Sequence, residues 1–143
     1  MARAYISVDL RRQVRADADE RCGYCHAPET FLGMPLDIEH IMPEALGGPS
    51  VRENLWLACP RCNDFKGDRI DAADPQTGQR MPLFNPRLQR WTEHFVWTLD
   101  GTRINGQTPE GRATVEALHL NNDFIVVARQ FWMEAGRWPP SGG

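Results

Sequence analysis

The sequence predicts an α+β fold: a core of two strands and a helix clamped by four cysteines, followed by a β-hairpin and two helices. Three observations lead to this prediction. Two Cys-x-x-Cys pairs flank residues 26–58, the segment between them contains alternating apolar and polar residues, and the last third of the chain has helical periodicity. We expect residues 1–70 to form the core and residues 71–143 to form an extension packed on it, giving one compact unit.

The composition is that of an ordinary globular protein, because 41% of the residues are apolar and 24% are charged. The longest apolar run, Phe124–Ala128, is far shorter than the roughly 20 residues of a membrane span, and Arg3 and Asp9 interrupt any signal peptide. We therefore expect a cytoplasmic protein with no membrane partner. The formal charge of −3 argues against a protein that coats nucleic acid through bulk positive charge, but it permits binding through a small site.

The core is predicted to begin with a surface helix over Val8–Arg21, which leads into the first cysteine pair. Alternation over Leu36–Ile41 predicts a strand. Met42-Pro43 is expected to end this strand, because proline restricts the residue before it and lacks an amide donor. A loop with two glycines follows at residues 44–50.

The second predicted strand, Asn54–Ala58, runs directly into the second cysteine pair. Asn63–Arg69 then fits a short helix. We expect Asn63 or Asp64 to lie near its N-cap, a position that favours short side chains with an acceptor oxygen.

The extension is predicted to contain a loop, a hairpin and two helices. Residues 71–90 are rich in proline, glycine and asparagine, which is typical of an ordered surface loop. His94–Leu99 and Thr102–Ile104, joined by an Asp-Gly turn, predict a β-hairpin. Helices are expected over Pro109–Leu118 and Asn122–Ala135, the second with a set of apolar residues at the spacing of a buried face: Phe124, Val127, Phe131 and Trp132.

The cysteines indicate a structural zinc site formed by Cys22, Cys25, Cys59 and Cys62. Each two-residue spacer lets one turn present two sulfur atoms to the same ion, and Zn²⁺ favours four thiolates in a tetrahedron. Disulfides and a redox Cys-x-x-Cys motif are the alternatives. A reducing cytoplasm disfavours the first, and the second normally occurs once per chain. With four protein ligands the ion has no open position for substrate, so the chemistry is expected elsewhere.

Several separated motifs together resemble the HNH endonuclease family. They are Asp37–Pro43, Gly47-Gly48, Asn54-Leu55, Cys59–Asn63 and Lys66-Gly67, and the resemblance extends over residues 22–69. It implies a zinc-stapled ββα-metal core. It also implies an enzyme, a metal-dependent endonuclease that hydrolyses DNA phosphodiester bonds and leaves 5′-phosphate and 3′-hydroxyl ends.

The resemblance assigns a role to each motif residue. His40 matches the general base, and Glu39 and Asn63 match the ligands of a catalytic divalent ion. Their oxygen donors suit Mg²⁺ or Mn²⁺. Asn54 matches the residue that braces the loop between the strands. Lys66 lies three positions after Asn63 and is expected to help hold the DNA strand, with further backbone contacts from Arg61 and Arg69.

Glu39 departs from the family, which more often has aspartate or histidine at this position. Its place beside His40 also raises a geometric question, because adjacent residues of a regular strand point to opposite faces. Both can reach one phosphate only if the strand bends or ends there, as Met42-Pro43 suggests.

Two other functions fit the same residues. One is a non-catalytic zinc module that binds nucleic acid or protein through this scaffold. The departure at Glu39, the departure at Asn63, where the family has histidine as often as asparagine, and the low net charge favour it. The other is a nuclease that acts on RNA. The sequence does not select an oligomeric state.

Overall fold

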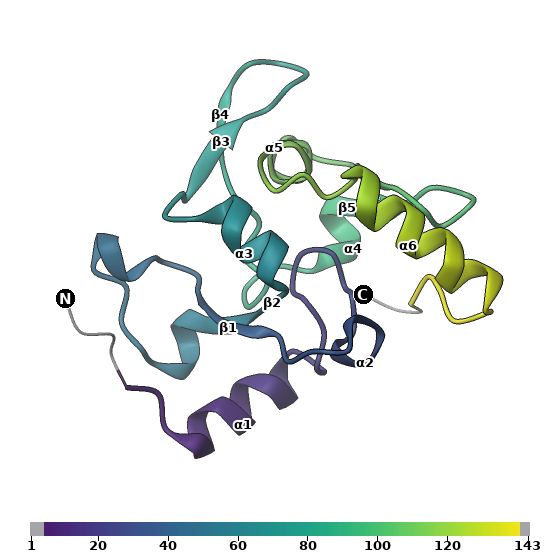
Figure 1. The fold of residues 1–143 in the computed structure, drawn as a ribbon. Coiled ribbons are helices and arrows are strands. Elements are labelled where there is room, and N and C mark those ends of the chain that lie inside the picture. Colours follow the sequence, from purple (N-terminus) through teal and green to yellow (C-terminus); the bar gives the residue numbers. More distant parts are fainter. Residues whose placement is uncertain (1–4, 141–143) are drawn as a thin grey trace. The chain divides into compact units, whose positions relative to one another are not determined.

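The computed structural model describes residues 5–140, and the chain divides into two compact units. The first consists of Met1–Ile70 and Asn85–Arg87, and the second of Asp71–Phe84 and Leu88–Gly143. Figure 1 shows the elements of both. The predicted packing of residues 71–143 on the core stays a prediction.

The first helix of unit 1, α1 (Val8–Asp17), begins at an N-cap in which the Ser7 hydroxyl accepts a hydrogen bond from the Leu10 amide. It buries Val14 completely and packs against the second strand. The predicted end at Arg21 is wrong, because Asp19 and Glu20 take left-handed backbone conformations that a helix cannot contain. A short helix, α2 (Glu29–Leu32), follows the first cysteine pair.

Two antiparallel strands form the centre of unit 1, as the sequence predicts. β1 (Asp37–His40) pairs with β2 (Leu55–Ala58), so that Asp37 lies opposite Ala58 and His40 opposite Leu55. Two short 3-10 helices, η1 (Glu44–Leu46) and η2 (Arg52–Asn54), lie in the connection. Leu55 and Leu57 of β2 are fully buried and anchor the sheet in the core.

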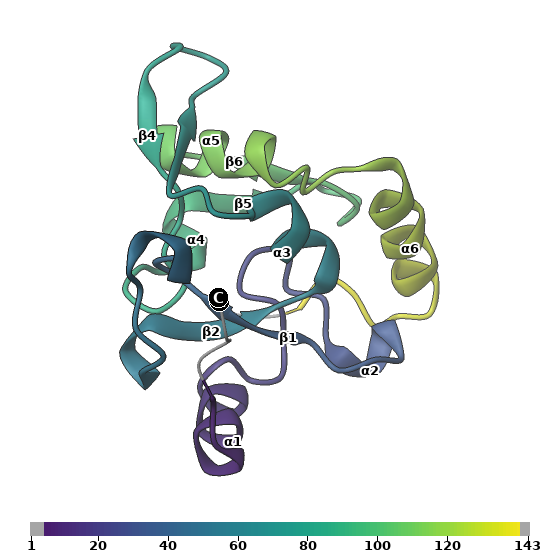
Figure 2. The same ribbon diagram turned by 60° about the vertical axis from the view of Figure 1, so that its left-hand side comes forward.

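The helix after β2, α3 (Pro60–Lys66), begins earlier than predicted. Its N-cap is Cys59, whose Sγ accepts a hydrogen bond from the Cys62 amide, and Pro60 occupies the first turn. The predicted N-cap at Asn63 or Asp64 is therefore wrong. Asn63 and Lys66 instead lie inside the helix, which contacts both β1 and β2 (Figure 2).

Unit 2 starts with a hairpin where the sequence predicts a loop. β3 (Asp71–Ala73) pairs with β4 (Arg80–Pro82) in antiparallel register. The turn between them is held by Asp74, a buried carboxylate that accepts two hydrogen bonds from Arg112. This partner lies far along the chain, so local composition did not reveal the hairpin.

The remaining elements of unit 2 are a short helix that the sequence does not predict, then the hairpin and the two helices in the predicted order. They are α4 (Trp91–His94), β5 (Phe95–Trp97), β6 (Ile104–Gly106), α5 (Pro109–Ala117) and α6 (Asp123–Glu134), with β5 and β6 paired in antiparallel register. Among the described residues, no helix has the length and hydropathy needed to cross a bilayer.

The buried face predicted for α6 is wrong. Phe124 and Phe131 are 77% and 65% exposed, whereas Val126 and Arg129 are buried. Arg129 donates hydrogen bonds to the Thr102 and Leu120 carbonyl oxygens. These bonds pair Nη1 and Nη2 of the buried guanidinium, which offsets part of the cost of burying the charge on this side of the helix.

Candidate active site and zinc centre

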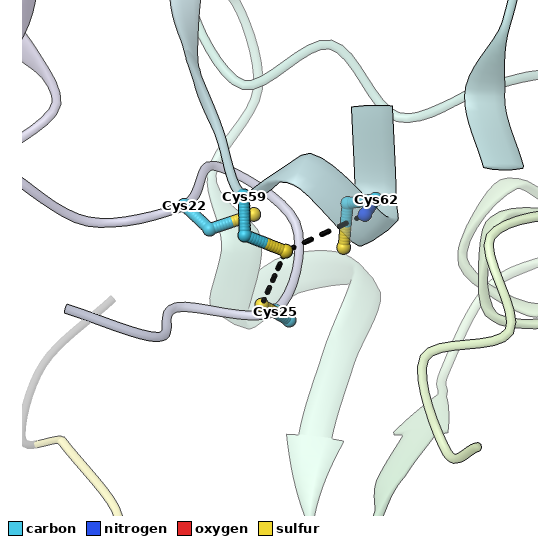
Figure 3. Close-up of side chains that lie close together, drawn as sticks. All are labelled: Cys22, Cys25, Cys59 and Cys62. Atoms are coloured by element: carbon cyan, nitrogen blue, oxygen red, sulfur yellow. Dashed lines mark hydrogen bonds between the residues drawn. The ribbon is translucent and has the colours of Figure 1, made fainter. Parts of the chain in front are cut away.

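The four cysteines meet at one point of unit 1. Their sulfur atoms all lie within 4.8 Å of one another, and all four residues are buried. Figure 3 shows Cys59 and Cys62 at the start of α3, facing the turn that holds Cys22 and Cys25. The predicted cluster is confirmed, and four convergent thiols without a disulfide are the donor set that Zn²⁺ prefers.

The thiols of this cluster are electrostatically coupled. Hydrogen bonds from the other three cysteines, that from Cys22 first, hold the pKa of Cys59 well below its usual range. Hydrogen bonds to neighbouring cysteines, with burial, raise the pKa values of Cys25 and Cys62. His26, directly after the first pair, lies outside the cluster, and burial lowers its pKa to about 4.

Glu39 points into the interior. Its Oε1 accepts a 2.7 Å hydrogen bond from the Tyr24 hydroxyl and lies 2.9 Å from the ammonium nitrogen of Lys66. Its Oε2 is buried and has no hydrogen-bond partner among the described residues. Burial raises the pKa of Glu39, and the charge of Lys66 opposes this effect.

Lys66 is buried as deeply as Glu39, its partner in the ion pair. Its side chain is 3% exposed, and Nζ also donates hydrogen bonds to the carbonyl oxygens of His40 and Ile41, at 3.3 and 3.0 Å. The ammonium group thus faces the strand instead of the solvent. Tyr24 lies within the first cysteine pair, so the zinc centre, Glu39 and the backbone of His40 form one connected group.

His40 ends β1 and is held from both sides of its ring. Nε2 lies 2.8 Å from the Ser50 hydroxyl, and Nδ1 lies 3.5 Å from the Glu44 carboxylate. Both partners come from the connection between the strands, and the imidazole is 13% exposed. Sequence reasoning missed Ser50 and Glu44, because loop composition does not show which loop side chains turn back to the strand.

Asn63 meets a second carboxylate that sequence reasoning did not single out. Its Nδ2 donates a 3.3 Å hydrogen bond to Oδ2 of Asp37, at the start of β1. The amide nitrogen therefore faces Asp37, and the amide oxygen is free to act as a ligand. Asp37 and Glu39 share one face of β1 by the alternation of the strand, and α3 contacts both.

Asn54 braces the loop that carries the partners of His40. Its side-chain oxygen accepts from the Met42 amide at 2.8 Å, and its nitrogen donates to the Met42 and Pro49 carbonyl oxygens at 3.0 Å. A Cβ at Gly48 would collide with the Met42 carbonyl oxygen, so only glycine fits.

A cavity of about 420 Å³ opens at the end of β1, and its lining contains Asp37, Glu39, His40 and Asn63. The strand ends at His40, one residue before the predicted end at Ile41. Glu39 and His40 do contact different neighbours, yet both line this cavity. Arg61 and Arg69 are exposed, lie near or within α3 and are not among its lining residues.

A pair of strands and a following helix clamped by a four-cysteine cluster, with a histidine at the strand end, define this unit as a core of the ββα-metal type. Residues 22–69 match the family model described as HNH endonuclease, so this segment forms an HNH endonuclease domain. The match supports nuclease activity on nucleic acid.

Two curated proteins are similar to the chain. The CRISPR-associated endonuclease Cas9 of Corynebacterium diphtheriae is 45% identical over 49 residues, which cover 34% of this chain and 4% of the relative. The Septu protein PtuB of Bacillus thuringiensis is 28% identical over 118 residues, which cover 78% of this chain and 41% of the relative. The chain thus spans less than half the length of either relative. A search of solved structures finds no match.

Proposed function

We propose that this protein is an endonuclease that hydrolyses DNA phosphodiester bonds with a divalent metal ion, leaving 5′-phosphate and 3′-hydroxyl ends. One observation carries the proposal: a histidine, acidic residues and an asparagine line a single cavity at the end of β1. These groups supply a base and oxygen ligands, which are the parts that metal-assisted phosphodiester hydrolysis requires. The name of one relative, an endonuclease, agrees with it.

Glu39 and Asn63 are the proposed ligands of the catalytic ion. Tyr24 and Lys66 engage Oε1 of Glu39 and leave Oε2 buried without a partner, and an unsatisfied buried carboxylate oxygen is costly unless it binds a cation. The amide oxygen of Asn63 adds a second hard donor, and Asp37 lies within its reach. This donor set fits Mg²⁺ or Mn²⁺, which when bound would stabilise charge on the phosphate.

His40 is the proposed general base. Ser50 and Glu44 fix the plane of its ring, and Lys66 fixes the carbonyl oxygen of its backbone. A base held in this way is oriented before substrate arrives, which removes part of the entropic cost of proton transfer. Asn54 supports the arrangement by holding the intervening loop.

Lys66 is proposed to act by positioning, since its ammonium group is committed to Glu39 and to two carbonyl oxygens. The contacts with DNA proposed for Arg61 and Arg69 rest on their exposure and on their positions in α3 and just after it. DNA as the substrate, in preference to RNA, rests on the family resemblance alone.

The test compares supercoiled plasmid with RNA of equal length, each incubated with Mg²⁺ or Mn²⁺. We expect cleavage of the DNA, and end-labelling before and after phosphatase treatment should reveal 5′-phosphates. His40→Ala should lower the rate by about 10²–10⁴-fold. His119→Asn is the control, because His119 is exposed and has a positive φ that asparagine tolerates. Cleavage of the RNA without cleavage of the DNA would contradict the proposed substrate and would indicate an enzyme that acts on RNA.

A further inference from the structure

We propose that Arg11 binds the phosphodiester backbone of the nucleic-acid substrate at the exposed side of the candidate active-site cavity. The inference rests on the proposed nuclease function and adds a substrate contact to it. Arg11 lies on α1, outside the segment that matches the HNH family model.

The charge of the cavity shows why such a contact is needed. Its described lining includes four acidic side chains, namely Asp37, Glu39, Glu44 and Asp68. Arg11 is the single lysine or arginine among these lining residues. A polyanionic strand that enters this cavity is repelled by the carboxylates that the divalent ion does not neutralise, so a cation at the rim lowers the electrostatic cost of binding.

Arg11 is available for this contact, whereas its neighbours on α1 are engaged. Arg12 lies 3.4 Å from the Asp9 carboxylate, and Arg15 forms two 2.6 Å hydrogen bonds with Glu29. The exposed Arg11 side chain has no ion pair or hydrogen bond with any residue of the described range 5–140. Its planar guanidinium offers five donors that match phosphate oxygens.

The position of Arg11 is fixed by its helix. Val14, one turn further along α1, is fully buried, and α1 packs against β2. β2 is hydrogen-bonded to β1, which carries Glu39 and His40. The backbone of Arg11 therefore belongs to the same packed scaffold as the proposed ligand and base. Lys66, which sequence reasoning assigned to the phosphate contact, is buried and committed elsewhere.

The experiment pairs Arg11→Ala with Arg12→Ala, which removes the adjacent exposed arginine of the same helix. Binding to a labelled DNA duplex is measured as a function of salt in the His40→Ala background, with Mg²⁺ present and cleavage suppressed. We expect Arg11→Ala to weaken binding by about 5–10-fold and to reduce the slope of log K against log[salt] by about one. Arg12→Ala should bind as the parent does, and Arg11→Lys should recover part of the affinity.

The same Arg11 and Arg12 variants are then made in the protein that retains His40, and their cleavage of DNA is measured. This assay separates the proposed role of Arg11 from the proposed nuclease function. Arg11→Ala should raise KM more than it lowers kcat, since a backbone contact made before the reaction contributes mainly to binding. Equal affinity of the two alanine variants, or no detectable binding by the parent, overturns the role of Arg11. Arg11-dependent binding without any cleavage by the parent supports the contact and overturns the proposed nuclease activity.

Discussion

Lys66 shows how a single buried residue can organise the site. A charged group is costly to bury unless it is paired and its hydrogen bonds are satisfied. Here Glu39 supplies the opposite charge, and the carbonyl oxygens of His40 and Ile41 accept the remaining bonds. The pair joins α3 to β1, so the same contacts that stabilise the fold also set the position of the proposed base.

Replacing Lys66 with alanine should therefore make the folded protein less stable. The change leaves the carboxylate of Glu39 buried without its counterion, so we expect the free energy of unfolding to fall by about 3 kcal/mol. Urea denaturation measures the loss. Arg61→Ala on the same helix is the matched control, because Arg61 is exposed and its removal should cost less than about 0.5 kcal/mol. Similar losses for both variants would contradict the buried pair.

The sequence predicts residues such as His40 and the cysteines because their types and spacing are set by local chemistry. It does not predict the direction of Glu39. That side chain is turned inward by Tyr24 and Lys66, which come from two other segments and meet it only in the folded chain. Asp37 was missed for the same reason, since Asn63 reaches it across the strand and helix.

At the scale of elements, Asp17 ties the end of α1 to the segment before β2. It accepts hydrogen bonds from Arg52 at 2.9 and 2.7 Å and from Arg87 at 2.9 Å, and Arg87 also donates to the Leu55 carbonyl oxygen. The Arg52 and Arg87 guanidiniums lower the pKa of Asp17 from 3.8 to about 2, against the opposing effect of burial.

Because this pKa is lower in the folded state than in the unfolded chain, the ion pairs contribute stability above about pH 4 and lose it as the pH falls toward 2. Asp17→Asn should cost about 1 kcal/mol at pH 7, and its difference from the parent should vanish near pH 2. Urea titrations at several pH values measure both. Asp9→Asn, on the exposed side of α1, should show little effect at any pH. A difference between Asp17→Asn and the parent that is independent of pH would argue against the ion pairs.

Elements with a strong local pattern were predictable. β1 alternates in hydrophobicity, β2 is a short apolar run, and Pro109 and Asn122 mark the starts of α5 and α6. The early start of α3 was not predictable, because Cys59 acts both as its N-cap and as a proposed zinc ligand. Which face of α6 is exposed was not predictable either. Periodicity places residues on one face of a helix, but it does not show which face is buried.

For the whole molecule, we predict that the fold requires zinc bound at the four cysteines. Cys59 caps α3, and its partners hold the turn that carries Tyr24, so loss of zinc should release the helix that carries Asn63 and Lys66. Circular dichroism should show reduced helicity after treatment with a strong chelator and recovery after addition of one equivalent of Zn²⁺. Unchanged helicity without zinc would contradict a structural role.

The acidity of the chain shapes its expected behaviour with nucleic acid. The formal charge is −3 with neutral cysteines, and four thiolates with one Zn²⁺ make it more negative. Affinity must therefore come from the catalytic ion and a few local cations such as Arg11, with a shallow salt dependence.

The central claim is tested most directly by single-turnover cleavage of a DNA duplex with the zinc-loaded protein, across a panel of divalent ions and in their absence. The account predicts cleavage with added Mg²⁺ or Mn²⁺, none without them, and a loss of about 10²–10⁴-fold for His40→Ala. No cleavage with any ion, or equal cleavage by parent and variant, would contradict it.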